Sequence, residues 1–169
     1  MQIIKYLMLV IILIFCTYIG ILISQRYSNR VKDLKEMKTA LNIFSTKVKL
    51  TYEPIPQIFK EISKKMKKEI SDIFMKASSN MEYMQAGDAW IKSLEVSNTN
   101  MNKDDIEVLK GLSNLLGKVD IEGQVSEIEL IDTFLNSQIE KAEEERKKNE
   151  KMYKTLGITV GLVITIILF

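Results

Sequence analysis

Hydrophobic residues are concentrated at the two ends of this 169-residue chain. Residues 6–23 form a run of 18 residues without a charged side chain. As a helix rising about 1.5 Å per residue, the run is roughly 27 Å long, close to the thickness of the bilayer's hydrocarbon core. Residues 156–169 form a second apolar run, which a snorkelling Lys154 lengthens towards a full span. We therefore expect transmembrane helices over residues 1–24 and 153–169.

Each end also has a competing interpretation. The N-terminal run has the apolar character of a cleaved signal peptide or a lipoprotein signal, but no small-residue cleavage site follows Ile23, and bulky Phe15 precedes Cys16. The C-terminal run has the character of a buried or interfacial helix, but it lacks a polar face. Retained membrane helices are the favoured interpretation at both ends.

Between the ends, apolar residues recur at intervals of three and four, which is typical of helices with one buried face. The first helix is predicted to continue from the N-terminal span to about Leu50, because the residue before Pro54 is disfavoured in helical geometry. The predicted apolar stripes are Val31, Leu34, Met37, Leu41, Phe44 and Val48; Ile55, Ile58, Phe59, Ile62 and Met66; Ile70, Ile73, Phe74 and Ala77; Ala86, Ala89, Trp90 and Leu94; Ile106, Leu109, Leu112 and Leu116; and Val125, Ile128, Ile131, Leu135 and Ala142.

The last two helices carry recognisable end signals. Asn102 is predicted to cap the fifth helix and Gly117 to stop it, while Asp120 is the expected cap of the final helix. No glycine or proline interrupts residues 124–156, so that helix is expected to run into the C-terminal span. Alternating strand patterns are absent. The fold class is therefore all-α, a bundle of about five or six helices over residues 25–152 between two transmembrane helices.

Composition removes most catalytic chemistry. The chain has no histidine and one cysteine, so histidine-based proton transfer, nucleophile pairs and thiolate metal clusters are excluded. We predict no catalytic, cofactor-binding or metal-binding residue, no small-molecule substrate and no enzymatic activity. The net charge of +2 provides no strong field for binding nucleic acid.

Positive charges flank the two apolar runs on the sides that face the centre of the chain. They are Arg26, Arg30, Lys32, Lys35 and Lys38 after the first run, and Lys141, Arg146, Lys147, Lys148, Lys151 and Lys154 around the start of the second. The positive-inside rule then places the central domain in the cytoplasm and both termini across the membrane.

Small residues recur every four positions in both apolar runs: Cys16, Gly20 and Ser24 in the first, and Gly157, Gly161 and Thr165 in the second. Such faces allow helix backbones to approach closely, so we hypothesise that Gly20, Gly157 and Gly161 pack the spans as a hairpin. Coincidence is the alternative, because glycine is common in membrane helices.

Residues 140–154 are charged almost all round. They indicate a solvated helix with pairs four residues apart, such as Glu143–Lys147 and Glu144–Lys148. A docking surface for a partner with the opposite pattern of charges is the alternative.

Three local patterns, taken in order with the apolar ends, resemble the stage III sporulation protein AB family of endospore-forming bacteria. They are residues 51–56 (TYEPIP), 116–124 (LGKVDIEGQ) and 150–157 (EKMYKTLG). Val119 departs from the second pattern, where a small polar residue is expected. The resemblance extends over essentially the whole chain.

The resemblance implies a role in a complex. It suggests a soluble domain similar to the cytoplasmic domain of type II secretion and type IV pilus platform proteins. It also implies a place in the mother-cell membrane around the forespore, with the other stage III sporulation AA–AH proteins as partners, among them the secretion-type ATPase, protein AA. Within the second pattern, Gly117, Asp120 and Gln124 are candidates for partner contact, although a helix stop at Gly117 and a helix cap at Asp120 are the favoured explanation of the first two.

The predicted function is thus a non-catalytic membrane platform subunit of a secretion-like complex linking mother cell and forespore. One alternative is a generic membrane-tethered helical scaffold. The other is a membrane enzyme that uses carboxylates to bind a metal, which would need several acidic residues converging on one cavity.

Overall fold

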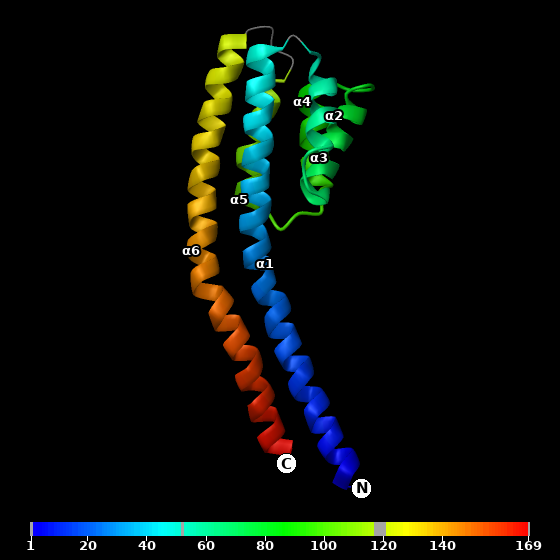
Figure 1. Cartoon of the computed structure of the whole chain (residues 1–169), viewed down its shortest axis with the longest axis vertical. Helices are drawn as coiled ribbons and strands as arrows, with labels where there is room; N and C mark the ends of the chain where they lie inside the picture. The colour runs from blue at the N-terminus through cyan, green and yellow to red at the C-terminus, as the bar shows by residue number, and fades with distance from the viewer. Residues whose placement is uncertain (1, 52, 117–120, 169) are drawn as a thin grey trace. The chain divides into compact units, whose positions relative to one another are not determined.

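The computed structural model describes residues 2–51, 53–116 and 121–168, with the side chains of residues 2, 3 and 121–125 left aside. Throughout these ranges the ordered elements are helices, and no strand occurs in them (Figure 1). The elements are α1 (Gln2–Leu50), α2 (Ile55–Ser63), α3 (Lys68–Asn80), α4 (Ala86–Glu95), α5 (Lys103–Lys110), the 3-10 helix η1 (Gly111–Asn114) and α6 (Ile121–Leu168). The prediction of an all-α chain with a long apolar helix at each end is confirmed.

The helices form two compact units. Unit 1 combines the two ends of the chain, Met1–Val31 and Lys141–Phe169, and unit 2 consists of Lys32–Glu140. Both long helices contribute one part to each unit. The predicted domain boundaries, 1–24, 25–152 and 153–169, refer to the edges of membrane spans and stay a prediction.

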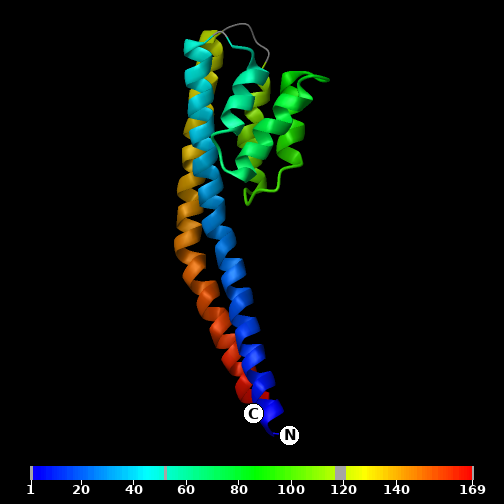
Figure 2. The same ribbon diagram turned by 45° about the vertical axis from the view of Figure 1, so that its right-hand side comes forward.

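An aromatic cluster fills the core of unit 2. The ring of Phe59 on α2 lies 5.3 Å from Phe44, 5.0 Å from Phe74 and 5.6 Å from Trp90, each time edge to face. All four residues are almost fully buried. The indole N–H of Trp90 donates a hydrogen bond of 2.7 Å to the carbonyl of Leu109, so burial leaves no polar atom of this side chain unpaired. Helices α2, α3 and α4 pack together around this cluster (Figure 2).

Two short helices end earlier than their apolar stripes predict. Helix α2 stops at Ser63, whose carbonyl accepts a 2.6 Å hydrogen bond from the Ser71 hydroxyl, and Met66 therefore lies in the following turn. Helix α5 stops at Lys110 and continues as the 3-10 turn of η1, so Leu112 is buried from η1 rather than from α5. Glycine at position 111 weakens the α-helix at this point.

Other local signals are confirmed. Asn102 caps α5 with a capping box, in which its side chain and that of Asp105 each accept a backbone hydrogen bond of 2.8 Å from the other residue. The predicted stripe of α3 is buried at all four positions: Ile70, Ile73, Phe74 and Ala77. The stripe of α1 within and beside unit 2 is buried from Val31 to Val48.

Gly87 lets α4 pack against η1. A Cβ atom at this position would lie 2.7 Å from the carbonyl oxygen of Ser113, a backbone atom that cannot simply rotate away. We expect Gly87→Ala to lower the free energy of unfolding by about 1–3 kcal/mol, as overpacking does elsewhere. Gly111→Ala is the matched control, because its Cβ would meet only the Ile131 side chain at 3.8 Å. The control should be neutral or up to about 1 kcal/mol more stable. Chemical denaturation of both variants checks this, and equal losses would contradict the packing argument.

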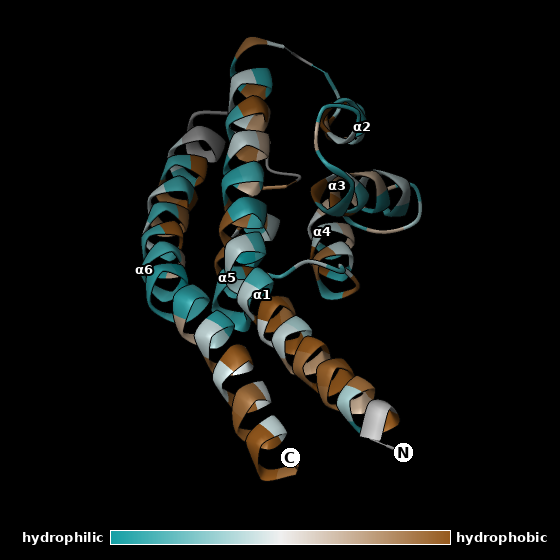
Figure 3. Ribbon diagram, turned by 60° about the horizontal axis from the view of Figure 1, so that its bottom comes forward, coloured by the Kyte–Doolittle hydropathy of each residue, from teal (hydrophilic) through white to brown (hydrophobic). Residues whose placement is uncertain are grey.

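In unit 1, the first part of α1 and the last part of α6 run side by side with opposite directions, so both termini lie at the same end (Figures 1 and 2). Large apolar side chains are exposed along the terminal stretches, and the ribbon there is mostly coloured as hydrophobic (Figure 3). Among the described residues, two helices, Ile4–Leu50 and Ser126–Leu168, are long and apolar enough to cross a membrane. An apolar exterior of this extent is unusual for a soluble surface.

Candidate functional site

The residues singled out in the 116–124 pattern lie largely outside the described part of the chain. Gly117 and Asp120 fall in the range that is not described, and Gln124 belongs to α6 without a described side chain. Their roles as helix stop, helix cap or partner contact stay predictions.

The described structure places the predicted small residues of unit 1 at the contact between its two helices. A Cβ atom on Gly20 would lie 2.6 Å from the carbonyl oxygen of Tyr153 and 3.0 Å from the Cα of Gly157. A Cβ atom on Gly157 would lie 2.8 Å from the carbonyl oxygen of Cys16. At Gly161 the approach is looser, with Cys16 Cβ at 3.2 Å. Backbone therefore meets backbone at Gly20 and Gly157, whereas their role in packing within a membrane stays a prediction.

Beyond the glycines, α1 and α6 are in contact through aromatic and charged side chains. The rings of Tyr27 and Tyr153 stack at a centroid distance of 5.8 Å. Arg30, whose side chain is 8% exposed, donates a 2.6 Å hydrogen bond to the carboxylate of Glu145. Loss of Glu145 would leave this buried guanidinium without that counter-charge, which is costly. The pair thus has a close-packed apolar part and a charged part that specifies register.

An open groove of about 470 Å³ lies in unit 2 between α5, η1 and the start of α6. Its apolar lining includes Leu130 and Phe134, which are 54% and 52% exposed and stand one turn apart on α6. Ile131 closes the floor and is 6% exposed. Large apolar side chains left half exposed beside a hollow are typical of surfaces that bind another protein.

The rim of this groove is acidic. Glu107 and Glu127 are the two charged side chains that line it among the described residues. Just outside, the Lys110 ammonium lies 3.0 Å from Glu107 and 3.2 Å from Glu95. Hydrogen bonding to Glu107, and then to Glu95, raises the pKa of Lys110 above its usual value. Lys110 thus forms ion pairs with Glu107 and Glu95 beside the groove.

Periodicity alone did not identify the groove. The predicted stripe of α6 follows Ile128, Ile131 and Leu135, all of which are buried. Leu130 and Phe134 lie off that stripe with a spacing of four, so they form a second apolar row on the same helix. This second row is the sequence feature that indicates a further contact surface, because the first row is sufficient to pack one face of the helix.

The described residues contain no group of three or more histidine, cysteine, aspartate or glutamate side chains that is arranged to hold a metal ion. Cys16 is a free thiol in unit 1, partly buried among apolar neighbours.

Comparisons of sequence and of structure identify similar proteins that cover most of the chain. The model of the stage III sporulation protein AB family matches residues 5–169. Stage III sporulation protein AB of Bacillus subtilis (strain 168) is 28% identical over 168 residues, covering 97% of this chain and 98% of that protein. A solved structure of stage III sporulation protein AB shares the fold, with a TM-score of 0.67 at 23% identity over 71% of this chain and 98% of the solved one. This protein belongs to the stage III sporulation protein AB family.

Proposed function

We propose that this sporulation protein is a non-catalytic membrane platform subunit of a secretion-like complex, and that its groove in unit 2 docks a cytoplasmic secretion-type ATPase. Other proteins of the stage III sporulation AA–AH set are its further partners. The observation that carries the proposal is the groove, where Leu130 and Phe134 are half exposed beside an acidic rim.

The membrane part of the proposal rests on unit 1. Its two helices have apolar exteriors, and both are long enough to cross a bilayer. Lysine and arginine flank the apolar runs on their inner sides, which favours a cytoplasmic position for unit 2. A cytoplasmic unit 2 in the mother cell would be accessible to a soluble ATPase.

The docking part rests on the shape and chemistry of the groove. A helix with an apolar face can place side chains against Leu130 and Phe134, which repeat at the spacing of one helical turn. Basic residues beside that face would lie next to the Glu107 carboxylate, whose side chain is 69% exposed at the rim. We therefore expect the ATPase to contribute an amphipathic segment with basic flanks.

Photocrosslinking in sporulating cells tests the docking site directly. A benzophenone amino acid in place of Phe134 should capture the secretion-type ATPase, stage III sporulation protein AA. The same amino acid in place of Tyr83, which is 85% exposed and does not line the groove, is the matched control. Capture from position 134 but not from 83 is the expected result.

Phe134→Asp should weaken ATPase binding by roughly 30-fold or more, because an apolar anchor at an interface contributes about 2 kcal/mol or more. Affinity measured with the purified full chain checks this, and unchanged Trp90 fluorescence shows that the core is intact.

In the photocrosslinking experiment, equal capture from positions 83 and 134 would overturn the docking site. Capture of other membrane proteins without the ATPase would instead favour a generic tethered scaffold.

A further inference from the structure

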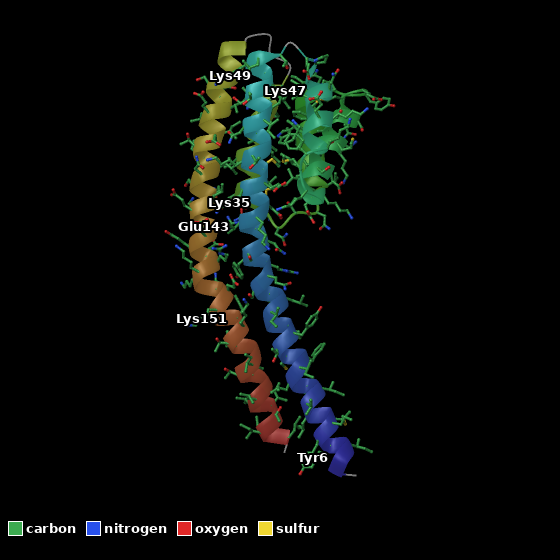
Figure 4. All side chains as sticks on the ribbon, viewed as in Figure 1. Tyr6, Lys35, Lys47, Lys49, Glu143 and Lys151 are labelled. Carbon is green, nitrogen blue, oxygen red and sulfur yellow. The ribbon has the colours of Figure 1, made fainter. Side chains whose placement is uncertain are left out.

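Helix α6 has two different faces within unit 1. One face contacts α1 through Glu145, Tyr153 and Gly157. Another face is lined by two rows of side chains around a shallow hollow of about 420 Å³. We name this the lysine face, and its members are Lys147, Lys148, Lys151, Met152, Thr155, Leu156 and Thr159. Figure 4 labels Lys151 on the part of α6 that belongs to unit 1.

The lysine face has a gradient of polarity along the helix. One row, spaced by four residues, reads Lys147, Lys151, Thr155 and Thr159. The neighbouring row reads Lys148, Met152 and Leu156. Both rows thus begin with ammonium groups and end with hydroxyl or apolar groups. Met152 and Leu156 are 40% and 46% exposed, so their apolar surface is available to a ligand.

The three lysines have no partner in the described part of the chain. The expected pairs of Lys147 with Glu143 and of Lys148 with Glu144 are not formed, and Lys151 makes neither a hydrogen bond nor an ion pair with a described residue. Two other cations in unit 1 do have partners: Lys154 lies 2.8 Å from Glu150, and Arg30 lies 2.6 Å from Glu145. Like charges one turn apart, as at positions 147 and 151, repel each other until an anion lies between them.

A hydroxyl donor stands where the charge ends. Thr159 donates its hydroxyl hydrogen bond to the carbonyl of Thr155, at 3.0 Å. The hydroxyl of Thr155 itself has no partner among the described residues, and it lies one turn beyond Lys151. An anion held by the lysines would therefore find a neutral donor next to the apolar surface.

We propose that the lysine face binds an anionic phospholipid, with the phosphate at Lys147, Lys148, Lys151 and Thr155 and an acyl chain along Met152 and Leu156. The ligand class follows from the gradient of polarity along the lysine face. A ligand that matches it has an anionic group to lie against the lysines, followed by a hydrocarbon chain to lie against the apolar side chains. Basic clusters beside a membrane-spanning helix select anionic headgroups in this way. This inference rests on the proposed C-terminal span, which places residues 147–155 at the level of the headgroups.

Native mass spectrometry of the full chain tests the proposal. Delipidated protein in neutral detergent is given equimolar phosphatidylglycerol and phosphatidylcholine, with soluble glycerol phosphate as a separate arm. We expect retained phosphatidylglycerol to exceed phosphatidylcholine roughly tenfold, and we expect no retained glycerol phosphate, which lacks the chain. The variant Lys147→Gln/Lys148→Gln/Lys151→Gln should lose that preference.

The matched control is Lys60→Gln/Lys64→Gln/Lys65→Gln, which removes the same charge from exposed positions of unit 2 and should keep the preference. An equal preference in both triple variants, or equal retention of the two lipids by the natural chain, would overturn the lipid site. In spheroplasts that express the chain, a membrane-impermeant maleimide should label a cysteine placed at Leu168 in a Cys16→Ser background, which reports on the C-terminal span separately. Labelling only after lysis would overturn both the span and the lipid site, whereas labelling of intact spheroplasts without lipid preference overturns the lipid site alone.

Discussion

Replacing Phe59 with alanine is expected to lower the free energy of unfolding by about 3–5 kcal/mol, the usual cost of removing a buried phenylalanine. Phe59 is fully buried, and its ring contacts Phe44, Phe74 and Trp90. The substitution therefore removes three aromatic contacts and leaves a cavity between α1, α2, α3 and α4. No other single side chain in the described core joins as many rings.

The chain carries its own reporter for this measurement. Trp90 is the one tryptophan in the sequence, and it lies in the same cluster. Chemical denaturation of the full chain in detergent, followed by Trp90 fluorescence, gives the free energy of unfolding of unit 2. Phe134→Ala is the control, because this phenylalanine is 52% exposed and should cost less than about 1 kcal/mol. A Phe59→Ala midpoint equal to that of the control would contradict the aromatic core.

The second large effect is expected at the contact of α1 and α6 in unit 1. Gly20→Leu would place its Cβ 2.6 Å from the Tyr153 carbonyl oxygen, so the two helices must separate. Overpacking of this kind costs about 1–3 kcal/mol, and here the obstacle is backbone rather than a movable side chain. We expect the population of the close-packed pair to fall roughly tenfold or more.

A disulfide provides the measurement. The Cβ position of residue 161 lies 3.2 Å from Cys16 Cβ, close to the separation found in disulfides, so Gly161→Cys creates a crosslink with the natural cysteine. Oxidation in membranes should crosslink this variant, and adding Gly20→Leu should slow the crosslink. Thr159→Leu is the matched control, since residue 159 is exposed on the lysine face. An unchanged crosslinking rate with leucine at position 20 would show that the helices do not meet there.

The helices of this protein could be predicted from its sequence because their signals are local. The spacing of Ile70, Ile73, Phe74 and Ala77 specifies a buried face whatever the rest of the chain does. Asn102 similarly caps α5 through atoms only three residues away. Each of these features depends on neighbours along the chain.

Features that depend on distant segments could not be predicted in this way. Gly87 is required by the carbonyl of Ser113, and the side chain of Asp33 accepts hydrogen bonds of 2.8 and 3.0 Å from Asn100, which is 67 residues away. Half exposure of Phe134 likewise depends on where α5 and η1 end. The spacing of apolar residues contains no information about contacts between distant segments. The groove, which depends on such contacts, could therefore be identified only from the three-dimensional structure.

The pairing of Gly20 with Gly157 has a consequence for the order in which the chain is made. The two glycines are separated in the sequence by the whole of unit 2. The helix around Gly20 therefore leaves the ribosome long before the helix around Gly157 has been made. At usual rates of synthesis the interval is on the order of ten seconds. During that interval the small-residue face of the first helix has no partner, while unit 2 is being completed. A chain interrupted late in synthesis would therefore carry most of unit 2 beside a helix whose small-residue face is still uncovered.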